Sequence, residues 1–352
     1  MTTHNRYLLV VLVLGCCTLP FANASFSLVA TDSKTRQVGA VGASCQLNWD
    51  PAWDVYKTSY VSVPNRSVLH IQGGGVQAFR FDGKSPLSIV AKNKMLEDDS
   101  TIQEVFESMK EYDALKNASV KEYDVWGVDD RQYIMADFES SAAFSGSNLG
   151  VFENELELDD IGIVKNDRYH AHAAGHFVKF GTVAALIEGF QNAENLGFVK
   201  ATPWGIQMDD LAGRLMSALW NVVFSAKQLG DDWCRRGYGV TSSGAYIHID
   251  NPDGTTLLHI NIAYTKLNGI DPADTLYGHF FEWRDNNVSP DVEWTYEYIE
   301  EQGDDDDDYD TSTGQKIMVQ LVRPFIFLLV FCFCFFVYKY CYKGNRNYDD
   351  ES

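Results

Sequence analysis

The residue of this chain that could most directly act as a nucleophile is a serine that follows a signal-peptidase motif. The small-x-small triplet Ala22-Asn23-Ala24 ends a segment with a short apolar run, and signal peptidase cuts after such a triplet. Cleavage there would make Ser25 the first residue of the mature chain. Its α-amine, with a pKa of about 8, could then act as the base for its own hydroxyl, which alone is a poor nucleophile. Serine is also common after cleavage sites, so a residue without a catalytic role is the alternative.

Five histidines fall into two groups that invite a metal or pairing interpretation. His170, His172 and His176 lie in the sequence HAHAAGH, and alternate residues of a strand share a face, so a zinc site is one interpretation. No cysteine or carboxylate stands beside them at matching spacing, which favours a surface strand that carries histidines. His248 and His259 are expected on opposite strands of a hairpin, facing the same side as a cross-strand polar pair. We predict no metal and no cofactor.

The elements that must position these residues are groups of strands with helices grouped between them. Asp32 begins a polar turn between two short β-rich runs, and we interpret it as a turn residue rather than an acid catalyst. The segment Asn251-Pro252-Asp253-Gly254 predicts a second hairpin. Strands are predicted over 26–30, 38–43, 61–72, 132–136, 141–144, 170–178, 245–250 and 255–263, helices over 86–91, 101–112, from 182 and over 209–230, and a solvated acidic loop over 153–160. This order indicates an α+β layered domain.

Composition bounds the class of protein. The chain has 352 residues, of which 45% are hydrophobic, so it can bury a sizeable core. Its formal net charge of −21 and its sequence pI of about 4.6 exclude nucleic acid as the expected partner, because nucleic-acid binding needs a basic surface.

The two ends of the chain predict its topology. Residues 1–24 read as a signal peptide; an uncleaved anchor is the alternative, which is disfavoured because the apolar run is shorter than the ~20 residues of a membrane span. Residues 317–338 are long and apolar enough to cross a bilayer, and the basic residues of the tail, 339–352, place that tail in the cytosol. The chain is therefore expected to be a single-pass type I membrane protein.

Two further segments complete this domain organisation. Residues 25–300 form the predicted ectodomain, and the aspartate-rich residues 301–316 form an acidic stalk between it and the membrane. We expect the ectodomain to be extracellular or lumenal, at the plasma membrane or another membrane of the secretory pathway. The membrane is then the one partner that the sequence indicates.

Cysteines and sequons agree with a secreted ectodomain. Outside the predicted signal peptide, membrane span and tail, only Cys45 and Cys234 remain, which predicts one disulfide in an oxidising compartment; two free buried thiols are the alternative. Asn65, Asn117 and Asn287 begin N-x-S sequons and are candidate glycosylation sites. Pro290 follows the last sequon, which makes Asn287 the least suited of the three.

Several short motifs, taken in order, resemble one protein family. They are the FSLVATD that follows Ser25, the VGAVGASC that ends at Cys45, the GVQA that starts at Gly75, Arg131-Gln132 with Asp137 and FSG at 144–146, and the GDDWC that ends at Cys234. Together they resemble the domain-of-unknown-function 1028 family, whose members look like N-terminal-nucleophile (Ntn) hydrolases. The resemblance covers about residues 25–263 and implies a four-layer αββα sandwich.

The resemblance also implies a role for Ser25. In Ntn hydrolases the first residue of the first strand is the nucleophile, and Ser25 occupies that position. Where relatives tend to have Gln-Gly-Asn, this chain has Ala174-Gly175-His176. The expected function is an amide hydrolase that acts on a small amide or peptide at the outer face of a membrane. The alternative is a catalytically inactive cell-surface ectodomain that binds a ligand or protein partner.

Overall fold

The computed structural model describes residues 24–45, 55–73, 86–119, 127–150, 156–165, 167–199, 210–224, 229–231, 234–235, 239–262, 271–286 and 291–294. The chain divides into two units, Met1–Glu297 and Tyr298–Ser352, and all described residues belong to the first. Within the described ranges no helix combines the length and the apolar character that a membrane crossing needs. The predicted signal peptide before residue 24, the stalk, the span over 317–338 and the tail lie outside these ranges.

A seven-stranded sheet carries Ser25 on its first strand. Its strand order is β11-β10-β9-β2-β1-β8-β7. Neighbours are antiparallel except β10 and β11, which are parallel. The strands are β1 (Ala24–Asp32), β2 (Gln37–Cys45), β7 (Leu156–Lys165), β8 (Tyr169–Lys179), β9 (Gly244–Asp250), β10 (Thr256–Ile262) and β11 (Asp291–Trp294).

A four-stranded antiparallel sheet faces the first one. Its order is β3-β4-β5-β6, with β3 (Tyr60–Val63), β4 (Ser67–Gly73), β5 (Arg131–Asp137) and β6 (Ser141–Ser145). Apolar side chains from both sheets, among them Val29 and Ala40 from the large sheet and Val68 and Ile134 from the small one, form a shared core. The two short 3-10 helices η1 (Val128–Asp130) and η2 (Ser147–Gly150) lie at the ends of β5 and β6.

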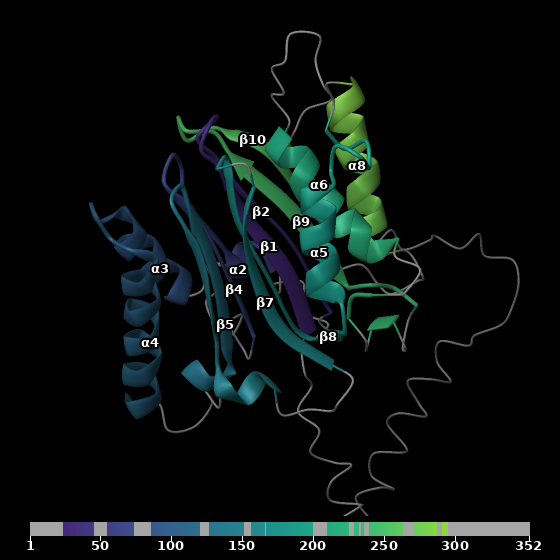
Figure 1. Ribbon diagram of the computed structural model, residues 1–352. Coiled ribbons are helices and arrows are strands. Elements are labelled where there is room, and N and C mark those ends of the chain that lie inside the picture. Colours follow the sequence, from purple (N-terminus) through teal and green to yellow (C-terminus); the bar gives the residue numbers. More distant parts are fainter. Residues whose placement is uncertain are drawn as a thin grey trace, which may run out of the picture. The chain divides into compact units, whose positions relative to one another are not determined.

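Helices cover the outer face of each sheet (Figure 1). On the seven-stranded sheet these are α5 (Thr182–Gln191), α6 (Asp210–Val223) and α8 (Pro272–Asn286). On the four-stranded sheet they are α3 (Pro86–Leu96) and α4 (Ile102–Ser119), while the short α2 (Val55–Ser59) packs near β4 and β9. The predicted combination of helices and strands in layers is therefore confirmed.

Local sequence explains the best-defined helices. At the start of α4, the backbone N–H of Thr101 donates to the Glu104 carboxylate and the N–H of Glu104 donates to Thr101 Oγ1, which is a capping box. Ile102, Val105, Phe106 and Met109 recur at helical spacing and are buried against the small sheet. In α6, the leucines at 211, 215 and 219 and Val222 form the equivalent buried stripe on the large sheet.

Three predictions on the elements need correction, and one helix was not predicted. The strand predicted over 61–72 is two strands, β3 and β4, joined by a turn in which Asn65 has φ 60°. The acidic loop predicted over 153–160 instead contributes to the edge strand β7. The helix predicted over 209–230 ends at Val223. Finally, α8 lies in a stretch for which no helix was predicted.

Candidate active site

Ser25 lies on the inner face of the large sheet, toward the second sheet. Successive side chains of a strand alternate between faces, and Phe26, Leu28 and Ala30 of β1 belong to the core beneath the helices. Ser25 and Ser27 therefore point the other way, between the sheets. Ser25 is buried, with 6% of its surface exposed.

A row of three polar residues crosses the central strands at Ser25. Ser44 on β2 and His176 on β8 are its partners in register on either side. The Oγ atoms of Ser25 and Ser44 are 2.7 Å apart and share a hydrogen bond. His176 is fully buried. The predicted nucleophile thus has a hydroxyl on one side and an imidazole on the other, on the same face of the sheet.

Polar side chains continue from this row into the second sheet. Ser27 Oγ donates to Gln72 Oε1 on β4 at 2.9 Å. Gln72 Nε2 in turn donates to Gln132 Oε1 on β5, and Gln132 Nε2 donates to Ser145 Oγ on β6 at 2.9 Å. These bonds tie β1 to three strands of the opposite sheet. They also make this end of the space between the sheets polar, next to the apolar side chains of the shared core.

A buried histidine and tyrosine line the same region. His70 Nδ1 and Tyr246 OH are 2.6 Å apart, and their rings stack with centroids 5.8 Å apart. Burial, with a smaller effect from the nearby His176, lowers the pKa of His70 to about 3. His70 is therefore neutral at pH 7 and offers a hydrogen-bonding group without a charge.

Gly42 makes room for this arrangement. It lies in register with both Ser27 and Tyr246. A Cβ at this position would stand 2.8 Å from Tyr246 Cε1 and 3.3 Å from His70 Cε1 and from Ser27 Cβ. The small residues of β2 thus allow side chains of three strands to meet. Sequence reasoning did not assign His70, Gln72, Gln132, Ser44 or Tyr246 to a site, because their proximity depends on strand register.

The histidines of β8 are buried, which corrects the predicted surface strand. His170 and His172 are 9% and 6% exposed. His172 Nε2 lies 3.0 Å from Asp160 Oδ1 on β7, and its Nδ1 lies 3.3 Å from Ser141 Oγ. Within the described ranges, the group of three residues whose ligand atoms converge as a metal site would require is Cys45, Asp231 and Cys234, and it includes no histidine.

The predicted disulfide between Cys45 and Cys234 is present, with Cα atoms 5.9 Å apart. Cys45 ends β2 and is the register partner of Ala24. The bond therefore anchors the strand end that carries Ser44 to the segment after α6. The backbone N–H of Cys234 donates to Asp231 Oδ1 at 2.8 Å, which holds that segment in place.

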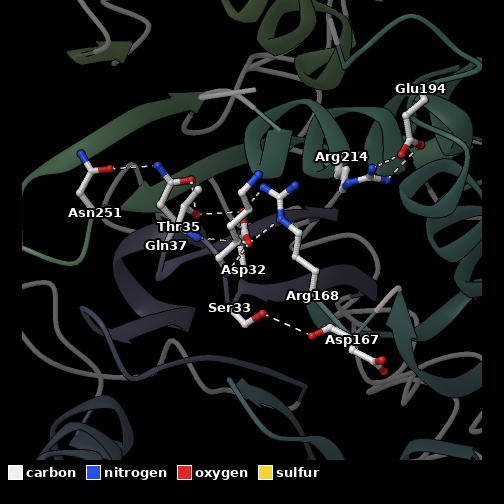
Figure 2. Close-up of polar contacts among 10 residues, drawn as sticks. Asp32, Ser33, Thr35, Gln37, Asp167, Arg168, Glu194, Arg214 and Asn251 are labelled. Carbon is white, nitrogen blue, oxygen red and sulfur yellow. Dashed lines mark hydrogen bonds and ion pairs between the residues drawn. The ribbon is translucent and has the colours of Figure 1, made fainter. Parts of the chain in front are cut away.

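Asp32, at the far end of β1, is a turn residue, as predicted (Figure 2). Its Oδ1 accepts hydrogen bonds from the backbone N–H of Lys34 at 2.9 Å and from Arg168 Nε at 2.8 Å. Its Oδ2 accepts from Thr35 Oγ1 at 2.9 Å and from Arg168 Nη2 at 2.6 Å. Every bond serves the β1–β2 turn or joins it to the β7–β8 turn, so Asp32 has a structural role here.

The three candidate glycosylation sites lie in different settings. Asn65 is exposed in the β3–β4 turn, and its Oδ1 accepts a hydrogen bond from Arg36 Nε at 2.8 Å. Asn117 belongs to α4, and Asn287 lies outside the described residues. Their occupancy stays a prediction.

Solved structures with a similar fold exist for this chain. No family model matches the sequence, and no curated protein matches it. A crystal structure of a Silicibacter pomeroyi protein, described as family-model DUF1028, is similar over 74% of this chain and 92% of its own, with 17% identity and a TM-score of 0.45. A likeness of this degree says nothing of activity, which rests on the residues of this chain.

Proposed function

We propose that the mature protein is an amide hydrolase of the N-terminal-nucleophile type, with the αββα layer order of that superfamily and with Ser25 as its first residue. The observation that carries the proposal is the place of Ser25. It stands at the start of the central strand β1, on the inner face, between Ser44 and His176. A substrate amide would bind beside the polar end of the space between the sheets.

The reaction would use Ser25 alone for proton transfer. Its α-amine takes the hydroxyl proton while Oγ attacks the amide carbonyl carbon. The tetrahedral intermediate then collapses, the C–N bond breaks, and the leaving amine takes the proton from the ammonium. Water, deprotonated by the same amine, hydrolyses the resulting ester, which releases the carboxylic acid and restores Ser25.

The neighbours of Ser25 suggest how the intermediate would be stabilised. The Ser44 hydroxyl, 2.7 Å from Ser25 Oγ, can donate to an oxyanion that forms beside it. His176, which stands where relatives tend to have asparagine, is the second candidate donor. His70 would remain neutral and support this side of the site through Tyr246 and His176.

We further propose that the ectodomain works in an extracellular or lumenal compartment, tethered by residues 317–338. The Cys45–Cys234 disulfide supports this part of the proposal, because disulfides form and persist in oxidising compartments. Substrates would then be small amides or peptides outside the cytosol.

Two experiments test the proposal. N-terminal sequencing of the protein purified from the membranes of eukaryotic cells that express it should begin at Ser25, and any other start sinks the nucleophile assignment. A β-lactone probe, which acylates activated hydroxyls, should then modify Ser25 in the wild type. Ser25→Ala should lose the label, whereas Ser100→Ala, which changes a serine outside the site, should keep it. Equal labelling of Ser25→Ala and wild type would favour a binding function instead.

That second candidate function, ligand binding without catalysis, is favoured by a cleft of about 490 Å³ beside the β3–β4 turn. Arg36, Asn65, Asp137 and Ser140 are among its lining residues, and so is Ser67, whose buried Oγ has no hydrogen-bond partner among the described residues. Such a wall suits a small neutral ligand with hydroxyl groups. Thermal-shift measurements with a panel of monosaccharides should show a rise in melting temperature that Ser67→Ala removes. The absence of any shift would count against this function.

A further inference from the structure

A second cluster of reactive side chains lies where β6, β7 and β8 meet. It consists of Ser141, Asp160 and His172. His172 is the register partner of Val29, which belongs to the core between the sheets, so His172 lies on the inner face of its sheet. It stands four residues along β8 from His176. At about 3.3 Å per residue this is roughly 13 Å from the row at Ser25, so the cluster does not belong to the proposed amide hydrolase site.

Asp160 orients His172 toward Ser141. The Oδ1 atom of Asp160 lies 3.0 Å from His172 Nε2. A carboxylate only accepts, so Nε2 carries a hydrogen, and in the neutral ring Nδ1 holds the lone pair. That Nδ1 lies 3.3 Å from Ser141 Oγ. A serine is activated by a base that a third group orients, within about 2.6–3.2 Å and often somewhat farther where no substrate is bound. The three side chains have this arrangement.

The hydroxyl of Ser141 has two acceptors within reach. Its Oγ donates to the backbone oxygen of Ala171 at 3.0 Å, and the lone pair of neutral His172 is the second acceptor. A hydroxyl has one hydrogen, so it bonds one of them at a time. The backbone thus holds Oγ in place, and a rotation about the Cβ–Oγ bond turns the hydrogen toward the base.

Gly162 on β7 makes room for the contact. It is the register partner of His172. A Cβ at this position would stand 3.0 Å from His172 Nδ1, 3.1 Å from its Cε1 and 3.3 Å from Ser141 Oγ. A glycine inside a strand often marks such a close approach. The missing side chain therefore lets the imidazole reach from one sheet to a serine of the other.

The backbone of β6 supplies a donor for an oxyanion. The N–H of Asp137 donates to the oxygen of Ser140 at 3.0 Å. Bonded and non-bonded pairs alternate in an antiparallel ladder, so the next pair, Ala136 with Ser141, is non-bonded. The N–H of Ser141 therefore points away from β5, and β6 is the last strand of its sheet in the described chain. This N–H can donate to an oxyanion that forms at Ser141 Oγ.

Exposure and charge indicate the kind of substrate. Ser141 is half-buried, and 39% of the Asp160 side chain is exposed, against 8% for His172. A reagent can therefore approach from the sheet edge while the imidazole is largely shielded from water. Asp159 is exposed next to Asp160, and two carboxylates disfavour an anionic substrate. An alcohol leaves more readily than an amine, so a site with a single backbone donor suits esters better than amides.

We propose that this cluster is a second hydrolytic site, which cleaves uncharged carboxylic esters, with Ser141 as nucleophile, His172 as base and Asp160 as positioning residue. Nδ1 of His172 takes the hydroxyl proton while Oγ attacks the ester carbonyl carbon. The bond to the alcohol oxygen breaks, and the alcohol leaves with the proton from His172. Water, deprotonated by the same nitrogen, then hydrolyses the acyl-serine and releases the carboxylic acid.

The test uses the purified full-length protein carrying Ser25→Ala, which removes any reaction at the proposed amide hydrolase site. This protein should hydrolyse p-nitrophenyl acetate. A fluorophosphonate should form an adduct with Ser141, located by mass spectrometry of the peptide that contains it. Ser141→Ala should lose both reactions. The matched control is Ser147→Ala, because Ser147 is exposed and its hydroxyl also bonds a carboxylate oxygen, at 2.9 Å; it should keep both.

Variants of the other two residues separate chemistry from structure. His172→Gln can still bond both neighbours but takes up no proton, so kcat/KM should fall about 100- to 10,000-fold with an unchanged melting curve. Asp160→Asn should lower kcat with little change in KM. Asp160→Glu, which restores a carboxylate at an exposed edge, should recover most of the rate.

Two outcomes would overturn the proposal. One is the absence of an adduct at Ser141 in protein with a native melting curve, a measurement that stands even if Ser141→Ala does not fold. The other is an undiminished rate in His172→Gln. If ester cleavage occurs only while Ser25 is present, it belongs to the Ser25 site, and this proposal fails while the proposed function stands. Ester cleavage at Ser141 beside an unreactive Ser25 in the wild type would have the opposite meaning.

Discussion

The ion pair between Asp32 and Arg168 provides a quantitative test of how the sheet is held together. The pair joins the β1–β2 turn to the β7–β8 turn, and the Asp32 side chain is fully buried while that of Arg168 is 21% exposed. Asp32→Ala removes the carboxylate that pairs with the largely buried Arg168 guanidinium. It also removes the acceptor for the backbone N–H groups of the turn. Such a change leaves one charge without its partner, which costs more than the pair itself contributes.

The expected loss follows from this geometry. Breaking a buried pair by removing one partner costs about 3–5 kcal/mol, and we expect the lower end, about 3 kcal/mol, because Arg168 can still reach water. Asp32→Asn keeps an oxygen acceptor for the N–H of Lys34, but its amide nitrogen replaces the oxygen that accepts from Thr35 Oγ1 and Arg168 Nη2. Because part of the hydrogen bonding of the turn is kept, this variant should cost less than Asp32→Ala, about 1–2 kcal/mol. The double variant Asp32→Ala, Arg168→Ala should lose less free energy of unfolding than the sum of the two single losses.

Urea unfolding of the purified protein measures these free energies. Asp253→Ala is the matched control, because Asp253 also accepts hydrogen bonds from a turn N–H and a threonine hydroxyl but is exposed and has no cation among the hydrogen bonds and ion pairs seen for it. Its loss should be much smaller. A loss below about 1 kcal/mol for Asp32→Ala, or strictly additive losses with Arg168→Ala, would refute the reasoning.

The pH dependence follows from the same pair. Burial alone would raise the pKa of Asp32, but hydrogen bonds from Arg168 and Thr35 and the charge of Arg168 outweigh it and hold the pKa below its ordinary value of 3.8. A lowered folded-state pKa contributes stability above 3.8 that is lost as pH falls through the folded-state value. Wild-type stability should therefore fall more steeply below about pH 4 than that of Asp32→Asn.

Two further predictions concern the strand that carries Ser44. The Cys45–Cys234 bond joins residues 189 positions apart. Replacing both cysteines by alanine should lower the free energy of unfolding by up to about 5 kcal/mol, because the unfolded chain gains entropy. The reduced wild type should match the variant, and an unchanged urea midpoint would contradict this prediction. Gly42→Ala should cost about 1–3 kcal/mol because its Cβ would stand 2.8 Å from Tyr246. At Gly278 in α8, an added Cβ would meet no atom within 4 Å apart from its chain neighbours and the backbone of its own helix. Gly278→Ala should therefore be neutral or stabilising in the same assay.

Elements with strong local signals could be predicted from the sequence. The hairpin through Asp32 and the one through residues 251–254 follow from turn chemistry between β-rich runs. The disulfide followed from elimination, because only two cysteines remained in the ectodomain. The pairing of His248 with His259 followed from counting across a hairpin whose turn is well specified.

The predictions that the structure corrects share a physical cause, because the sequence alone does not show which strands are neighbours in a sheet. The acidic residues 153–160 were interpreted as a loop because they are charged. An edge strand such as β7 also accepts charged side chains, and its Asp160 contacts His172 of β8. The same contact explains why His172 of β8 can be buried. The turn at Asn65 was overlooked inside a β-rich run, although asparagine after proline is a turn signal.

The candidate site was predictable only in part, for a similar reason. The sequence could indicate Ser25 from the cleavage motif, because that signal is local. It did not indicate Ser44, and it raised His176 through the resemblance and the metal interpretation but not as a neighbour of Ser25, since each meets Ser25 only through the register of β1 with its two neighbours. The network through Gln72 depends further on how the two sheets face each other.

The position of Ser25 also constrains the order of events that would produce a free α-amine. A protease binds its substrate as an extended, unpaired chain, but β1 lies between β2 and β8 and Ser25 is buried. The Ala24–Ser25 bond must therefore be cut before β1 is enclosed. The enclosing strand β8 begins only at Tyr169, so a peptidase that acts during translocation meets an open chain. Cleavage by signal peptidase would in this way make the amine that the proposed mechanism needs, without any self-processing step.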